Sequence, residues 1–144
     1  MGCDIHLHIE IKINDTWHHY SHPHVTRNYG LFAKMAGVRN HGLGIIPIAM
    51  PKGLPDDITE LTKYCFDRDN RSYYPHDISW LGPAEIADLE DWLNETYPGD
   101  FGHDLEHSLL HCYLFGNSFA GFHKYPEERE PNLTDLRFVF WFDN

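Results

Sequence analysis

Residues 3–13 alternate between apolar and polar side chains without a break, and this pattern constrains the fold more than any other part of the sequence. Successive side chains of a β-strand point to opposite faces, so the pattern predicts a strand with one face against a core. The apolar face carries Cys3, Ile5, Leu7, Ile9, Ile11 and Ile13, and the polar face carries Asp4, His6, His8, Glu10 and Lys12. Two histidines between two carboxylates indicate a functional surface; a solvated face of a sheet covered on one side is the alternative.

The rest of the chain predicts both strands and helices. After a turn at Asn14-Asp15, residues 16–20 form a return strand, and the aromatic segment 136–144 is apolar on both faces, as in a buried central strand. Helices are predicted at 29–37, 59–66, 83–97 and 104–115, with a Gly- and Pro-rich loop at 39–57, extended at 45–49, and a second extended segment ending at Pro75. The pattern predicts an α+β fold over residues 1–144, a single domain with a small, mainly antiparallel sheet and three to four helices.

Length and charge limit the classes of function. A chain of 144 residues has room for one core, and its formal charge of −11 disfavours binding to duplex nucleic acid or anionic lipid. No segment approaches the roughly 20 apolar residues of a membrane span, so we expect no membrane partner. Three cysteines give neither a disulfide framework nor a paired zinc-thiolate motif. These features predict a protein of the cytoplasm.

The polar face of the first strand is a candidate metal site. His6 and His8 are two positions apart, roughly 6.6 Å along a strand, so both imidazoles can approach one ion beside Asp4. His103, His107 and His111 step by four along a predicted helix, and His107 and His111 could supply the remaining ligands. Imidazole and carboxylate ligands suit Zn, Mn or Fe. Histidines on the exposed flank of an amphipathic helix are the alternative.

Other residues are candidates for catalysis or substrate binding. Glu10 or the pair His76-Asp77, predicted at a loop-to-helix junction, could transfer protons, although a helix-capping turn explains the pair equally well. Residues with side chains suited to phosphate or to a planar ring are Arg27, Asn28, Arg39, Asn40 and Trp80. Surface salt bridges are the alternative for the arginines. A cluster of His18, His19, His22 and His24 could bind metal, line the same cleft or be solvated.

Several segments together resemble a family of small conserved proteins of tailed phages and prophages. The matching segments are GCDIHLHIE, RNYGLFAKMAGVRN, GLPDD, SWL and RFVFWFDN, which span nearly the whole chain. His76 stands where the family has a histidine before Ser-Trp-Leu, whereas Asp77 departs from the pattern. The resemblance implies expression in a bacterial host cytoplasm during infection. It implies no catalytic residue, because the family has no assigned chemistry.

These observations lead to two hypotheses. The first is a metal-dependent phosphoesterase that acts on a nucleotide or cyclic-nucleotide signal during infection, with Asp4, His6 and His8 holding the ion and the arginines holding phosphate. The second is a binder, expected as a homo-oligomer, that sequesters such a messenger between the rings of Trp17, Tyr20 and Trp80. A protein-binding inhibitor is a third possibility, but it would not account for the polar residues of the first strand.

Overall fold

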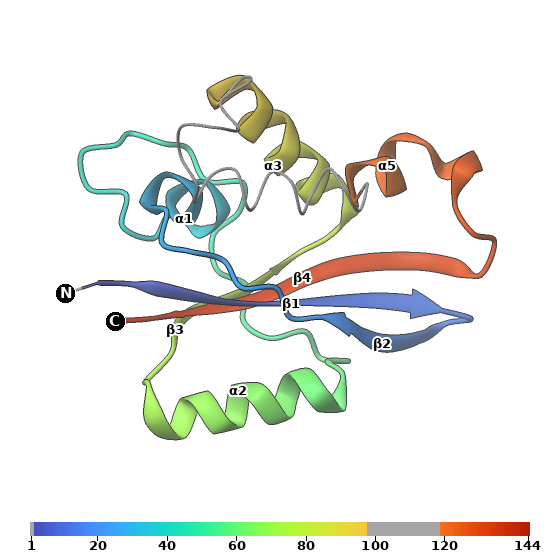
Figure 1. Ribbon diagram of the computed structural model, residues 1–144, viewed down its shortest axis with the longest axis horizontal. Helices are drawn as coiled ribbons and strands as arrows, with labels where there is room; N and C mark the ends of the chain where they lie inside the picture. Colours follow the sequence, from blue (N-terminus) through green and yellow to red (C-terminus); the bar gives the residue numbers. More distant parts are fainter. Residues whose placement is uncertain (1, 98–118) are drawn as a thin grey trace.

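The computed structural model describes residues 2–97 and 119–144, in which one four-stranded sheet organises the chain. The strands are β1 (Asp4–Ile13), β2 (Thr16–Ser21), β3 (His76–Leu81) and β4 (Leu133–Asp143), all antiparallel and in the order β2-β1-β4-β3. Helices α1 (Tyr29–Ala36), α3 (Pro83–Thr96) and α5 (Phe119–Lys124) cover one face, and α2 (Glu60–Ser72) covers the other (Figure 1). A 3-10 turn, Pro126–Glu128, leads towards β4. The predicted α+β fold is confirmed.

The two central strands are the ones whose sequences indicated burial most clearly. β1 pairs with β4 along its whole length, from Asp4 opposite Asp143 to Ile13 opposite Leu133. Phe138, Phe140 and Phe142 of β4 point into the larger core and are at most 1% exposed. The prediction of a buried central strand at 136–144 is therefore confirmed.

The β1–β2 hairpin turns at the predicted dipeptide. Asn14 and Asp15 have φ values of 47° and 64°, the left-handed conformation that a two-residue hairpin turn requires at both central positions. Asn and Asp tolerate this conformation better than most residues because their short polar side chains bond locally. The turn places β2 at one edge of the sheet.

The larger core lies between the sheet and helices α1, α3 and α5. Helix α1 is capped at its start by Asn28, whose side chain accepts a hydrogen bond from the Leu31 amide, and at its end by Gly37 with φ of 74°. Helix α3 begins at Pro83 and buries Ile86, Leu89 and Leu93. The apolar face of β1 completes this core, as its alternation predicted.

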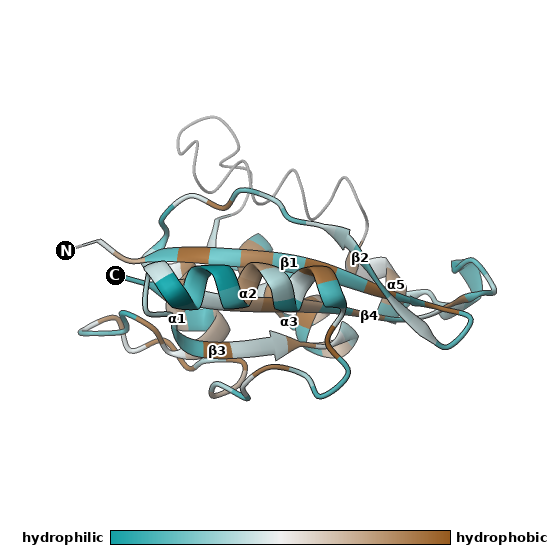
Figure 2. Ribbon diagram, turned by 90° about the horizontal axis from the view of Figure 1, so that it is seen from below, coloured by the Kyte–Doolittle hydropathy of each residue, from teal (hydrophilic) through white to brown (hydrophobic). Residues whose placement is uncertain are grey.

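The polar face of β1 differs from the expectation of an accessible functional surface, because α2 packs over it. A smaller core forms there from Cys65, Val139 and Trp141. His8 is 1% exposed and Glu10 is fully buried. Figure 2 shows α2 lying across the sheet and the alternation of polar and apolar residues along β1. Both faces of the sheet are thus covered, and the row of polar residues is in large part interior.

Three predicted elements differ from the structure. The segment expected to be extended up to Pro75 begins with Arg71 and Ser72, which instead belong to α2. The helix predicted at 59–66 continues to Ser72, because Thr62, Cys65 and Asp69 extend its buried face. Residues 76–81, expected at a loop-to-helix junction, form the edge strand β3 instead. The helix predicted at 104–115 lies outside the described residues. Among the helices of the described part, none combines the length and apolar composition needed to cross a membrane.

Candidate functional site

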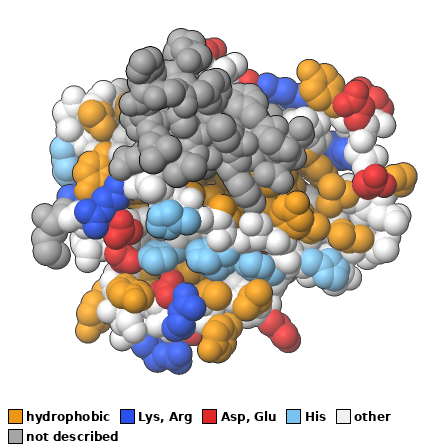
Figure 3. Space-filling view, viewed as in Figure 1, with side chains coloured by type: hydrophobic (Ala, Val, Ile, Leu, Met, Phe, Trp, Pro, Cys, Tyr) orange, Lys and Arg blue, Asp and Glu red, His pale blue; other side chains and the backbone are white. Residues whose placement is uncertain are grey.

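Histidine side chains line the side of the molecule where β1 and β2 meet α2 (Figure 3). Four of them, defined here as the histidine row, are His6, His8, His19 and His22. His8 Nδ1 lies 3.0 Å from His19 Nε2, and the rings of His8 and His22 stack in parallel with centroids 4.0 Å apart. The row brings residues of the predicted strand together with part of the second histidine cluster. The sequence did not predict this stacking.

His6 lies between two carboxylates at one end of the row. Its Nε2 donates to Asp143 Oδ2 at 2.5 Å, and its Nδ1 is 3.6 Å from Asp69 Oδ2. Asp69 also accepts hydrogen bonds from Trp141 Nε1 and Arg68 Nε, so α2 and β4 fix its position. The His6 side chain is 24% exposed, which makes it accessible to small molecules. A carboxylate that fixes an imidazole is a common feature of catalytic and metal sites.

His8 is held as a neutral ring. It stacks between His22 and Trp141, with the centroid of the Trp141 ring 5.0 Å away. Burial, with smaller contributions from His22 and His19, lowers the pKa of His8 to about 3. Its Nε2 is buried without a hydrogen-bond partner in the described structure.

The metal site predicted from the sequence is not assembled within the described residues. Asp4 accepts two hydrogen bonds from Arg27, at 2.6 Å and 3.1 Å, which hold the pKa of its carboxyl below the ordinary value. Across residues 2–97 and 119–144, no group of three or more His, Cys, Asp or Glu side chains is arranged to hold a metal ion. His103, His107 and His111 lie outside this part of the chain, so the shared site remains a prediction.

The carboxylate of Glu10 is buried and makes hydrogen bonds that hold parts of the fold together. Its Oε1 accepts from Arg137 Nε at 2.7 Å, and its Oε2 accepts from the Thr59 amide, the Thr59 hydroxyl and the Thr62 hydroxyl. These contacts join β1 to β4 and to the first turn of α2. With every oxygen engaged and no exposed surface, Glu10 is poorly placed for proton transfer.

The pair His76-Asp77 lies away from the histidine row. The His76 ring stacks on Phe142, a residue of the larger core, so it belongs to the opposite face of the sheet from His6. His76 Nδ1 donates to Asp77 Oδ2 at 2.6 Å, and Asp77 has φ of 49° at an irregularity in the β3–β4 pairing. The predicted pair exists, but the sheet separates it from His6 and His8, the predicted metal ligands on β1.

Four of the predicted substrate-binding residues, two arginines and two asparagines near α1, make separate contacts and do not form one site. Arg27 binds Asp4, and Arg39 donates to Asn144 at 3.1 Å near His76. Asn28 caps α1, while Asn40 exchanges hydrogen bonds with the backbone of Ile45. None of the four lies beside Trp80, the fifth predicted substrate-binding residue, which lines a cleft on the α2 face.

A cleft of about 540 Å³ lies on the α2 face, at the end of β1 away from His6. Trp17 of β2 and Trp80 of β3 both line it, although they come from opposite edges of the sheet. Its charged residues are Lys12, Lys52, Asp56, Asp57, Asp135 and Arg137, and all of its lining lies within the described residues. The sequence identified both tryptophans as ring-binding candidates; here they share one cleft.

A cation lies over each indole ring of the cleft. Lys52 Nζ is 4.0 Å from the centroid of the Trp80 ring, and the Arg137 guanidinium carbon is 3.8 Å from that of Trp17. Lys12 Nζ lies 5.7 Å from the Trp17 centroid. These are cation–π distances, which fix the positions of the rings and the charges. Lys12 and Arg137 were not recognised as site residues, because only the strand register brings them beside Trp17.

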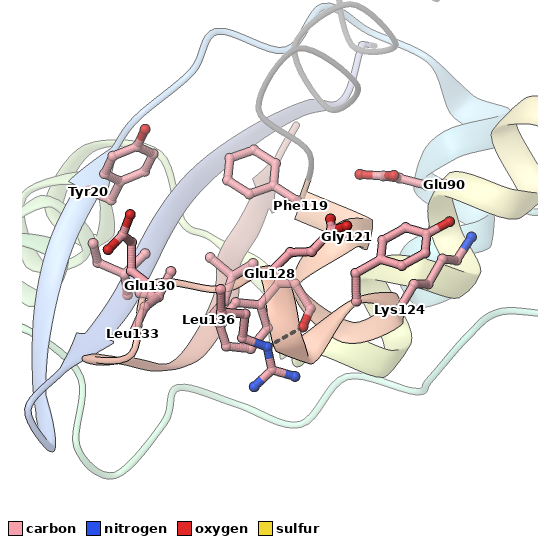
Figure 4. A pocket seen from close by; sticks show the side chains of 13 residues that line it. Tyr20, Glu90, Phe119, Gly121, Lys124, Glu128, Glu130, Leu133 and Leu136 are labelled. Atoms are coloured by element: carbon pink, nitrogen blue, oxygen red, sulfur yellow. Dashed lines mark hydrogen bonds between the residues drawn. The ribbon is translucent and has the colours of Figure 1, made fainter.

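Tyr20, the third aromatic residue of the predicted binder, lies elsewhere. It lines a second cavity of about 630 Å³ with Phe119, Tyr125 and other residues of the α3–α5 side (Figure 4). This cavity is therefore separate from the cleft that Trp17 and Trp80 share.

Comparisons of the chain with protein-family models, curated proteins and solved structures give no match.

Proposed function

We propose that the chain binds a nucleotide in the cleft between Trp17 and Trp80 and leaves it chemically unchanged. The observation that carries this proposal is the shared cleft, with one indole at each side and a cation over each ring. Stacking of a base on an aromatic side chain is worth about 1–3 kcal/mol and tolerates any base. The volume of about 540 Å³ is within the usual range of small-molecule sites.

The charges of the cleft suit a ligand with both a base and a phosphate. Lys12 has no ion pair within the described structure, so its ammonium group is available to a phosphate oxygen. Asp135 presents a carboxylate that can accept from the amide or amino group of a base, such as N1–H or the 2-amino group of guanine. A mixed lining of this kind favours a nucleotide over a simple anion.

Isothermal titration calorimetry with the four ribonucleoside monophosphates and their cyclic forms tests the proposal. Trp17→Leu and Trp80→Leu should each weaken nucleotide binding about tenfold or more, because each removes a stacking ring. Trp92→Leu is the matched control, since Trp92 contacts Tyr97 and Lys34 outside the cleft. Chromatography of the ligand after incubation should recover it intact. Absence of binding across the panel, or binding indifferent to both cleft tryptophans, contradicts the proposal.

A metal-dependent phosphoesterase remains the second candidate. The placement of His6 between Asp143 and Asp69 supports it, because carboxylates of this kind orient metal-binding and catalytic imidazoles. Elemental analysis of untagged protein purified without chelator should then find Zn, Mn or Fe near one per chain. Loss of that metal in a His6→Ala/His8→Ala double variant, together with chelator-sensitive turnover, would decide for the enzyme.

We also propose a setting for either activity. The resemblance to phage and prophage proteins supports a role in the cytoplasm of an infected bacterium, where removal of a nucleotide messenger would counter host defence. A homo-oligomer would increase the number of messenger molecules held per particle. Light scattering of the purified protein measures its oligomeric state, and infection assays with and without the gene measure the effect on host defence.

A further inference from the structure

The carboxylate of Asp57 already occupies an anion position inside the proposed nucleotide cleft. Its Oδ1 accepts from Arg137 Nη1 at 2.6 Å, and its Oδ2 accepts from Trp17 Nε1 at 3.0 Å. The hydrogen bond from Arg137 is the main reason why the pKa of the Asp57 carboxyl lies below its ordinary value. A guanidinium and an indole N–H that converge on one carboxylate form a pair of donors suited equally to a phosphate.

Two cations of the cleft, Arg137 and Lys52, are paired with carboxylates that differ in their exposure to water. Glu10, the inner partner of Arg137, is fully buried and also held by Thr59 and Thr62. Glu85, the partner of Lys52, is 27% exposed. Asp57 is 62% exposed and can turn into water at little cost, because most of its surface is hydrated already.

Arg137 is also held by contacts that do not involve the Asp57 carboxylate. Its Nε stays bonded to Glu10, and its Nη2 donates to the backbone carbonyl of Asp57 at 3.1 Å rather than to the side chain. The ring of Trp17 also stacks under the guanidinium. Removal of the Asp57 side chain therefore exposes a guanidinium N–H and an indole N–H that are already positioned for an oxyanion.

We infer that Asp57 stands in for the phosphate of the ligand, and that a nucleotide binds by displacing this carboxylate from Arg137 and Trp17. The inference rests on the proposed nucleotide-binding function. It makes Asp57 a residue that sets specificity: only a ligand with an oxyanion strong enough to compete with an intramolecular carboxylate is retained. A nucleoside with the same base but no phosphate has nothing to place there.

The experiment compares Asp57→Asn with Asp56→Asn, using calorimetric titrations of guanosine 5′-monophosphate and guanosine. Both variants remove one negative charge from the lining of the same cleft, but only Asp57 contacts Arg137 and Trp17. Asp57→Asn should bind the nucleotide about tenfold more tightly, as expected when one charged competitor for two hydrogen bonds is removed. Its affinity for guanosine, and both affinities of Asp56→Asn, should stay at wild-type values.

A second readout reports on the contact itself. In ¹⁵N-labelled protein the Trp17 indole N–H resonance should move on titration with the nucleotide, and should already be displaced in unliganded Asp57→Asn. Asp57→Ser, which lacks any carbonyl at this position, replaces Asp57→Asn if the latter unfolds at a lower denaturant concentration than wild type.

The outcomes separate the two proposals. Equal nucleotide affinities of wild type and Asp57→Asn, or an equal gain in Asp56→Asn, would overturn the role of Asp57 while the binding function stands. Failure of wild type and both Asp57 variants to bind the nucleotide would overturn both. Binding by the Asp57 variants alone would also overturn both, because a nucleotide would then fail to displace the carboxylate of the wild-type chain.

Discussion

The buried ring of His8 should make the stability of this protein fall steeply on mild acidification. In the unfolded chain the imidazole titrates near its ordinary pKa of about 6.5, whereas in the folded chain burial lowers the pKa of His8 to about 3. Below about pH 6.5, His8 therefore binds a proton in the unfolded state but not in the folded state. The contribution of His8 to stability is fully present above this pH and is lost progressively as the pH falls towards 3.

The magnitude follows from the difference between the two pKa values. A pH of about 5 lies about 1.5 units below the pKa of the imidazole in the unfolded chain, so protonation there stabilises the unfolded state by about 2 kcal/mol. His8→Phe keeps the stack between His22 and Trp141 and removes the orphaned Nε2, but it also loses the hydrogen bond between Nδ1 and His19, so its stability at neutral pH should lie within about 2 kcal/mol of wild type. Near pH 5 the variant should be more stable than wild type by about 2 kcal/mol beyond any difference at neutral pH.

Urea unfolding of both proteins, near pH 7.5 and near pH 5, measures this difference. His18→Phe is the matched control, because it makes the same substitution at an exposed histidine of β2. His19, whose pKa burial also lowers, contributes in the same direction but remains in both proteins. A stability difference between wild type and His8→Phe that is the same at both pH values would refute the reasoning.

Three further predictions concern residues whose role the structure redefines. Glu10→Gln should lower the free energy of unfolding by about 3 kcal/mol, since it leaves the buried Arg137 without its inner carboxylate; Lys63→Ala, which breaks an exposed pair with Asp67, should cost less than 1 kcal/mol in the same urea experiment. Asn28→Ala should lower the free energy of unfolding by about 1 kcal/mol through loss of the α1 cap, and Asn28→Ser should recover most of this loss. Nucleotide affinity should stay constant in both variants. Weaker calorimetric binding in both would show that Asn28 contacts the ligand after all. Gly37→Ala should lower thermal stability by about 1 kcal/mol because its φ of 74° disfavours a side chain, and an unchanged melting temperature would contradict this explanation.

The sequence predicted the framework of the fold because local patterns determine it. Local spacing alone predicts the secondary structure and burial of three segments: the alternating residues 3–13, the turn at Asn14-Asp15 and the apolar segment 136–144. β3 was missed because His76-Asp77 interrupts its pairing and only four residues alternate afterwards. The extent of α2 was underestimated because Asp69, a charged residue, belongs to its buried face.

The candidate site was less predictable, because it depends on which residues of different elements meet. Trp17 and Trp80 could be identified as ring-binding candidates, but no spacing links residues on opposite edges of a sheet. The role of Asp57 could not be read from its Gly- and Pro-rich surroundings, since its partner Arg137 is 80 positions away. The polar row of β1 suggested a surface because a single strand carries no sign of the helix that covers it.

The pairing of β1 with β4 also determines the order of events during synthesis. His6 and Asp143 meet across the two central strands although they are 137 positions apart. Until β4 emerges from the ribosome, β1 has only its hairpin partner β2, and one backbone edge and its apolar face remain open to other chains. Contacts so distant in sequence also close slowly. A chain that has not yet reached residue 133 therefore lacks the partner of this edge, and its hairpin presents the kind of unpaired strand that favours association with other chains.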